Sequence, residues 1–137
     1  MLTTFEKILI LHQLPFFADL TTDDLRRISD ICDEVYFAAG ERMIQAGEEG
    51  NELYILEYGR VRVFQEESGE TVSELTPPAF IGEIALLSDG RRKASVEALE
   101  NTNTLAISRD KFKQTIMRFP HIIFPITSTI LSRILNS

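Results

Sequence analysis

All seven glycines of this 137-residue chain lie between residues 40 and 90, and none lies before or after that segment. Glycine is the residue that most readily adopts the positive φ angles of tight turns. The middle of the chain therefore has to turn often, whereas the two flanks can form longer elements. This distribution predicts helices at both ends and a sheet of short strands between them.

Both flanks carry apolar residues at helical spacing. Thr21, with Asp24 three residues later, is a candidate N-cap for a helix in the N-terminal flank. A helix is expected over residues 109–119, where Pro120 would stop it. A last, strongly apolar helix is expected over residues 122–135, interrupted or started late by Pro125. The two N-terminal apolar stripes consist of Phe5, Ile8, Leu9 and His12 and of Leu25, Ile28, Ile31 and Cys32.

The glycine-rich middle is predicted to form short strands, which are typical of an antiparallel barrel or jelly roll. In the stretch 60–63 polar and apolar residues alternate, so Val61 and Val63 should face the same side of the sheet. No repeat or linker divides the chain, so we expect one domain over residues 1–137. Its parts are an N-terminal helical segment (1–34), a barrel (35–108) and C-terminal helices (109–137). The expected strands are residues 35–37, 43–44, 53–56, 61–64, 71–75, 94–98 and 104–107.

Composition and charge exclude several classes of function. The net charge of −7 disfavours nucleic acid as a partner, and no apolar run approaches the ~18 residues of a membrane span. The first residues do not have the pattern of a signal peptide, so we expect none. The single Cys32 permits no internal disulfide and is expected to be buried and inert. We therefore expect a cytoplasmic protein. His12 and His121 are the only histidines. We therefore predict no metal, no cofactor and no enzymatic activity.

The segment 80–96 lies between expected strands but is too apolar for an ordinary loop. Gly82 directly precedes good helix formers at 83–87, and a short helix that begins at a glycine presents N–H groups and a positive dipole end to an anion. Three basic residues follow, Arg91–Lys93. Because eleven acidic and only three basic residues lie between residues 40 and 90, this basic cluster is locally anomalous.

These residue types together describe a nucleotide site. The guanidinium of Arg92 matches the oxygens of a phosphate, and the carboxylate of Glu83 can accept a hydrogen bond from a sugar hydroxyl. Val63 and Val72 could supply apolar barrel wall. The alternative is a salt bridge between Glu83 and Arg92, which contributes little where it is exposed. Arg91 and Lys93 are more readily explained as solvated surface. The sequence around Ser95 also resembles a basophilic kinase site, but Ser95 is expected within a strand.

Residues 82–86 and Arg92 resemble the phosphate-binding cassette of the cyclic nucleotide-binding domain family. Further similar stretches lie at residues 14–20, 38–41, 45–48 and 53–61, so that the resemblance extends roughly over residues 12 to 135. The resemblance implies an eight-stranded antiparallel jelly-roll β-barrel with N-terminal and C-terminal helices.

In such a domain the cyclic phosphate of cyclic AMP or cyclic GMP is held by the arginine and by backbone amides, and the glutamate binds the ribose 2′-hydroxyl. The C-terminal helix caps the base, and its movement is the switch. The chain departs from the family pattern at Arg91, where proline is common, at Lys93, where a small residue helps select the base, and at residues 77–79, which lack a glycine–acid pair. The resemblance and the residue types together predict ligand contacts at Val63, Val72, Gly82, Glu83, Ile84, Ala85, Arg92, Lys93, Ala94 and Ser95.

Three hypotheses follow. The first is a regulatory module that binds a cyclic mononucleotide and signals through its C-terminal helix. The second is a docking domain on the same fold that binds no ligand and serves a larger protein. The third, a DNA-binding regulator, ranks last because the chain is acidic and lacks a helix-turn-helix. The expected partners are a cyclic nucleotide and other domains or a protein bound at the C-terminal helix, with no nucleic acid and no membrane contact. Without an output element, the chain is expected to be part of a longer protein.

Overall fold

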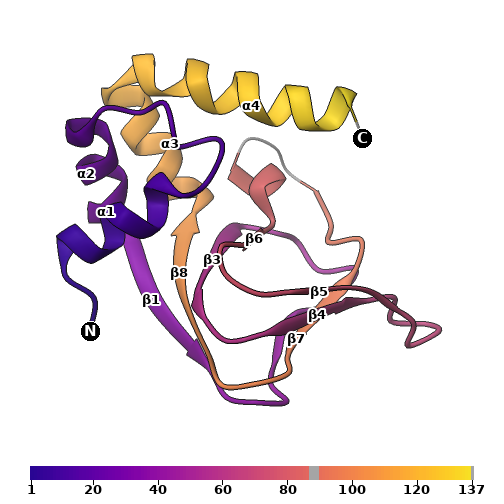
Figure 1. Ribbon diagram of the computed structural model, residues 1–137. Coiled ribbons are helices and arrows are strands. Elements are labelled where there is room, and N and C mark those ends of the chain that lie inside the picture. Colours follow the sequence, from indigo (N-terminus) through magenta and orange to yellow (C-terminus); the bar gives the residue numbers. More distant parts are fainter. Residues whose placement is uncertain (87–89, 137) are drawn as a thin grey trace.

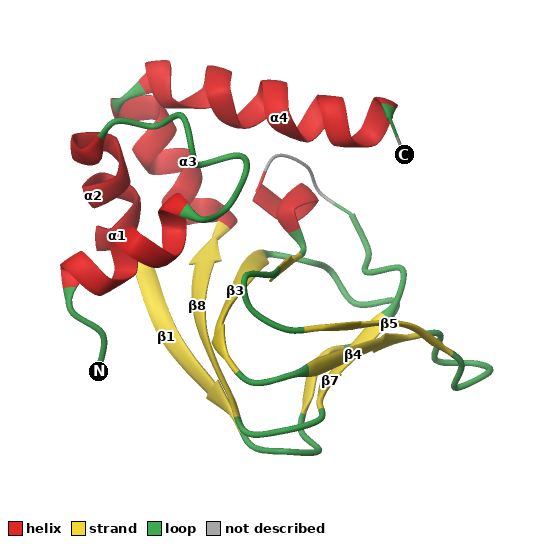
Figure 2. Ribbon diagram, in the orientation of Figure 1, coloured by secondary structure: helices red, strands yellow, loops and turns green. Residues whose placement is uncertain are grey.

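Helices from the two ends of the chain gather on one side of the molecule, and the strands between them form two sheets (Figure 1; Figure 2). The computed structural model describes residues 1–86 and 90–136. Helix α4 passes above the short helix η1, which follows the strand β6 (Figure 1). The helices are α1 (Thr4–His12), α2 (Thr22–Asp30), α3 (Arg109–Arg118) and α4 (Ile123–Leu135), with the 3-10 helices η1 (Glu83–Leu86) and η2 (Pro120–Ile122).

The described residues form eight strands in two four-stranded sheets, and every strand pair is antiparallel. The strand orders β1-β8-β3-β6 and β2-β7-β4-β5 place sequence-distant strands side by side, as in a jelly roll. The predicted fold class is confirmed. The strands are β1 (Cys32–Phe37), β2 (Arg42–Ile44), β3 (Glu52–Tyr58), β4 (Val61–Phe64), β5 (Thr71–Leu75), β6 (Phe80–Ile81), β7 (Ser95–Ala98) and β8 (Thr102–Ser108).

Local sequence signals account for the ends of the helices. Thr3 and Glu6 form a capping box at the start of α1. The Thr21 hydroxyl accepts the N–H of Asp24 at 3.1 Å, so the predicted N-cap of α2 is confirmed. Helix α3 ends at Arg118, two residues before Pro120, as expected.

Two local predictions were wrong. Cys32 was predicted on a helical stripe, but α2 ends at Asp30, and Cys32 begins β1 opposite Ile107. The prediction was wrong because Ile31 and Cys32 continue the helical spacing of apolar residues beyond the end of the helix. Strand β6 was not predicted, since two residues are too few to show an alternation. The predicted helix over 83–87 is a 3-10 helix over Glu83–Leu86, and residue 87 lies outside the described part of the chain.

Two apolar clusters stabilise the fold. The first joins the helices to the sheet that contains β1, β8 and β3, and it includes the fully buried side chains of Phe17, Leu53 and Phe112. The second includes Leu56, Val61 and Val96, from both sheets. Phe16 meets Phe80 edge-to-face, with ring centroids 4.8 Å apart. This contact fixes β6, the strand that leads into Gly82, against the N-terminal part of the core.

Helix α4 is apolar on two sides. Its inner side contributes Ile126 and Ile130 to the first cluster, whereas Phe124, Leu131 and Leu135 are exposed. None of the described helices is long and apolar enough to cross a membrane. The outer side of α4 therefore exposes several large apolar side chains to solvent.

Burial should make Cys32 unreactive, because burial raises the pKa of its thiol to about 12 and the thiolate is the reactive form. We expect a disulfide-exchange reagent at pH 8 to leave the folded protein unlabelled and to label one thiol per chain in denaturant. A Ser128→Cys variant, whose new thiol lies at an exposed position of α4, should react with one equivalent while folded. Labelling of the folded unsubstituted protein at the rate of that control would contradict the burial of Cys32.

Candidate functional site

The backbone of Arg92 is fixed by the loop between β2 and β3. The Arg92 N–H donates to the carbonyl of Glu48, and the Arg92 carbonyl accepts the N–H of Gly47, both at 2.8 Å. The Gly50 N–H also donates to the carbonyl of Gly90 at 3.0 Å. Two loops that are more than forty residues apart in sequence therefore run together, and the start of the Arg92 side chain is held by main-chain hydrogen bonds.

The Arg92 side chain lies in a slot between two glycines, Gly50 and Gly82. One guanidinium nitrogen donates to the carbonyl of Glu52 at 2.6 Å. A β-carbon at Gly50 would come within 2.5 Å of Arg92 Nε, and one at Gly82 would collide with Nη1. Gly82 also has a φ of +87°, a conformation that side-chain-bearing residues rarely adopt. The sequence therefore needs glycine at Gly82 for both backbone conformation and space.

The charge of Arg92 is only partly compensated. Burial lowers the pKa of its guanidinium, although the nearby Tyr54 and Glu52 oppose this effect. Among the described residues, no carboxylate lies within ion-pair distance of the guanidinium. A half-buried cation whose bound acceptor is a neutral carbonyl can gain considerably from an anion, since the low-dielectric surroundings strengthen the attraction.

Glu83 lies at the start of η1 and faces helix α4. Its carboxylate is 3.6 Å from Nη1 of Arg133, and its side chain is only 23% exposed. The Arg133 guanidinium also lies over the ring of Phe80, 4.4 Å from its centroid. In the structure Glu83 therefore pairs with Arg133 of α4, and the alternative, a salt bridge between Glu83 and Arg92, is not formed. The Ala85 N–H donates to the carbonyl of Gly82 at 3.0 Å, and Ile84 lies beside it in η1.

The other predicted contact residues differ in burial and in their position in the sheets. Val63 is half-buried against the second cluster, and Val72 is 59% exposed on the edge strand β5. Lys93 is exposed, and Ala94 is half-buried. Ser95 is buried at the start of β7, as expected for a strand residue; its hydroxyl accepts the Ala46 N–H at 3.0 Å and donates to Glu66 at 2.5 Å.

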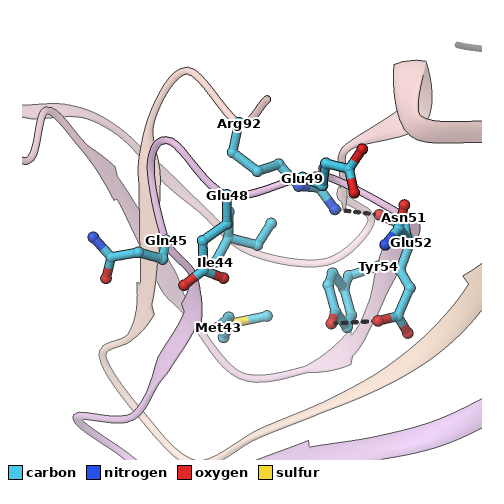
Figure 3. A pocket seen from close by; sticks show the side chains of 9 residues that line it. All are labelled: Met43, Ile44, Gln45, Glu48, Glu49, Asn51, Glu52, Tyr54 and Arg92. Carbon is cyan, nitrogen blue, oxygen red and sulfur yellow. Dashed lines mark hydrogen bonds between the residues drawn. The ribbon is translucent and has the colours of Figure 1, made fainter. Parts of the chain in front are cut away.

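Two hollows flank this region. A small one, about 130 Å³, lies beside Arg92 and is lined by carboxylates, including those of Glu48, Glu49 and Glu52 (Figure 3). It is smaller than the ~300–1,000 Å³ of small-molecule pockets, and its negative lining would repel a phosphate. An open groove of about 630 Å³ lies next to Lys93, between Gly47 and the 65–68 turn that joins β4 and β5. This groove has the size of a small-molecule pocket.

Four residues of the site were not predicted from the sequence: Gly50, Glu52, Tyr54 and Arg133. Glu52 contributes a main-chain carbonyl, which no side-chain pattern can reveal. Tyr54 donates to the Glu52 carboxylate at 3.3 Å, and burial, followed by the charge of Glu52, raises the pKa of Tyr54 to about 12. A glycine beside acidic residues in the 47–52 loop was the available signal, and it indicates only a turn.

Comparison with known proteins identifies the family of the chain. The sequence profile of the cyclic nucleotide-binding domain matches residues 34–119, which include all of the strands β2 to β8 and the segment from Gly82 to Arg92. The chain belongs to the cyclic nucleotide-binding domain family. As a family, these domains have a regulatory role rather than a catalytic one, and the matched segment contains the cassette identified above.

Curated relatives of this cyclic nucleotide-binding domain include the cAMP-dependent protein kinase regulatory subunit of Emericella nidulans. It is 34% identical over 106 residues, 77% of this chain and 26% of the relative. The human cGMP-dependent protein kinase 2 is 33% identical over 117 residues, 82% of this chain and 15% of the kinase. The chain thus spans about a quarter or less of the length of these relatives.

Solved structures agree with the family assignment. The N-terminal domain of a transcriptional regulator from Streptomyces coelicolor A3(2) superposes with a TM-score of 0.85 over 93% of this chain and 91% of that one, at 23% identity. The Thermus thermophilus catabolite activator protein gives a TM-score of 0.77 over 90% of this chain and 59% of that one, at 28% identity. The first likeness concerns the fold alone.

Proposed function

We propose that this domain captures a cyclic mononucleotide, cyclic AMP or cyclic GMP, and reports its presence through helix α4. The observation that carries the proposal is the half-buried guanidinium of Arg92, held between Gly50 and Gly82 without a carboxylate partner among the described residues. The role is regulatory and non-catalytic. The single buried thiol suits a reducing compartment, so the cytoplasm is the proposed location.

In this proposal the cyclic phosphate binds the guanidinium of Arg92 near Gly82 and η1, and Arg92 shifts within its slot to admit it, because Nη1 occupies the space beside Gly82 in the structure. The missing side chain at Gly82 lets the phosphate approach the backbone closely. The Ala85 N–H, which now donates to the Gly82 carbonyl, and the Ile84 N–H are the candidate backbone donors, so a small change at η1 would accompany binding. Lys93, next to the open groove, and the neighbouring Ala94 and Ser95 are the residues proposed to meet the rest of the ligand.

Glu83 would connect the ligand to the switch. A ribose 2′-hydroxyl needs an acceptor, and Glu83 is the carboxylate in the cassette that can serve as one. In the structure this carboxylate faces Arg133 of α4 at 3.6 Å. A ribose and Arg133 would therefore compete for one carboxylate, and occupancy of the site would weaken the attachment of α4 to the cassette.

The test is a calorimetric titration of the protein with cyclic AMP, cyclic GMP and, as a control, the linear 5′-monophosphates. We expect heat and a rise in melting temperature with at least one cyclic nucleotide, and weaker binding of its linear counterpart. Absence of both signals at millimolar cyclic nucleotide would favour the second function, a ligand-free docking domain. The exposed side chains of Phe124, Leu131 and Leu135 on α4 are the observation that favours that alternative.

Replacing Arg133 by alanine should make nucleotide binding tighter, because the substitution removes the competitor for Glu83. A partly exposed ion pair contributes at most about 1 kcal/mol, which corresponds to an affinity gain of up to about fivefold. The gain should be absent when Glu83 is already glutamine, as measured in a double-mutant cycle. Ser132→Ala, the neighbouring exposed position, serves as control. An unchanged affinity in Arg133→Ala would show that the contact plays no part in binding.

A further inference from the structure

His121 is tied to a buried carboxylate on another helix. Its Nε2 lies 3.0 and 2.9 Å from the two carboxylate oxygens of Asp24, on α2. The Asp24 side chain is only 5% exposed, whereas the His121 side chain is 61% exposed. The buried Asp24 carboxylate is therefore a fixed acceptor, whereas the His121 ring is largely exposed to solvent.

Other charged side chains surround this contact between α2 and the turn that follows α3. Asp24 also accepts a hydrogen bond from Arg27 at 2.6 Å. The Arg27 guanidinium lies over the ring of Phe119, 4.1 Å from its centroid, and that of Arg118 lies 5.4 Å from the same ring. The charged groups shown in contact with the Asp24–His121 pair or with Phe119 are thus Arg27 from α2 and Arg118 from α3.

The contact lies at the base of α4. His121 belongs to η2, the turn directly before α4, and the adjacent Ile122 is fully buried. Among the described residues, the charged contact at the other end of α4 is made by Arg133 to Glu83. Helix α4 is therefore attached near its end by the Arg133–Glu83 ion pair on the cassette, and the turn at its start is attached to α2 by the Asp24–His121 hydrogen bond, with Ile126 and Ile130 in the core between them.

We propose that the Asp24–His121 pair is the pivot of α4, and that its strength sets how readily α4 leaves the cassette. This proposal rests on the proposed function for its consequence in signalling, but the attachment itself does not require a nucleotide. Both residues are positioning residues, since neither belongs to the cassette.

The acceptor of the pair is a charged group. Burial raises the pKa of the Asp24 carboxyl, but hydrogen bonds from Arg27 and His121 outweigh this effect, so that the pKa is lowered overall and Asp24 stays ionised in mildly acidic solution. A hydrogen bond to an ionised carboxylate is stronger than one between neutral groups. The hydrogen bond between Asp24 and His121 is therefore the interaction on which the pivot depends.

Hydrogen exchange of the α4 amides in the nucleotide-free full chain tests the pivot. We expect His121→Phe to speed exchange over residues 123–135 by about tenfold, and His121→Gln, which keeps a donor, to restore most of the protection. His12→Phe, which removes the other, exposed histidine, should leave α4 unchanged.

The outcomes separate this proposal from the proposed function. Unaltered α4 exchange in His121→Phe, or exchange in His121→Gln as fast as in His121→Phe, would overturn the pivot. If His121→Phe does not fold, the comparison of His121→Ala with His121→Gln decides the question in the same way. If α4 exchange behaves as expected while calorimetry detects no cyclic nucleotide, the pivot stands and the proposed function fails. If nucleotide binds, His121→Phe should bind it a few-fold more tightly.

Discussion

Replacing Arg92 by alanine is expected to abolish measurable nucleotide binding. Each hydrogen bond to a charged group contributes about 1.5–3 kcal/mol, and a guanidinium can make two such bonds to one phosphate. The affinity should therefore fall by about a hundredfold or more. The measurement is a calorimetric titration, supported by the loss of the nucleotide-dependent rise in melting temperature.

The adjacent Arg91 provides a matched control. It carries the same charge one residue away, but it is exposed and donates to the carbonyl of Gly47 at 2.7 Å. Arg91→Ala should leave the affinity within about threefold, the change expected from one screened surface charge. Arg92→Lys keeps the charge but not the planar fork, and it should bind at an intermediate level. Equal affinities in Arg92→Ala and the unsubstituted protein would refute the proposed cassette, whatever ligand binds elsewhere.

Gly82→Ala should destabilise the fold and impair binding together. The left-handed backbone at Gly82, with φ of +87°, costs a residue with a β-carbon about 1–2 kcal/mol. The new methyl group would also collide with Arg92 Nη1 and lie 3.0 Å from the carbonyl oxygen of Glu52. Arg92 would have to leave its slot, so the affinity should drop by at least tenfold in addition to the loss of stability.

Gly69 separates these two effects. It has a similar φ of +71°, but a β-carbon there meets nothing within 4 Å. Urea unfolding of Gly69→Ala should therefore report the backbone cost alone, with unchanged nucleotide affinity. Equal losses of stability and equal affinities in the two variants would mean that the space around Gly82 has no role in placing Arg92.

The local sequence was sufficient to predict the barrel because its signals are short-range. The stretch 60–63 alternates and follows Gly59, and the structure has β4 over Val61–Phe64, the residues expected for this strand. By contrast, Cys32 was assigned to a helix because its spacing to Ile28 fits one. Its pairing with Ile107 involves residues that are far apart in sequence, and such pairing overrides local periodicity.

The closeness of Gly82 to Arg92 could be expected from the sequence for the same reason. Gly82 and Arg92 lie within one segment, so their relation was visible in the sequence. The carbonyl of Glu52 is 40 residues away from Arg92, and Arg133 is 50 residues from Glu83; only the folded chain brings them together. Side-chain chemistry can be inferred from residue types, whereas main-chain acceptors and the helix that covers a site depend on topology.

The hydrogen bond from Tyr54 to Glu52 gives this protein a built-in optical reporter. The chain has no tryptophan and three tyrosines, of which Tyr36 and Tyr58 are 51% and 47% exposed. Tyr54 is the one that lies beside the guanidinium slot, since the carbonyl of its partner Glu52 holds Arg92. A ligand that draws Arg92 away from that carbonyl would alter the surroundings of the Tyr54 side chain. Tyrosine fluorescence would then report occupancy of the site without any attached dye.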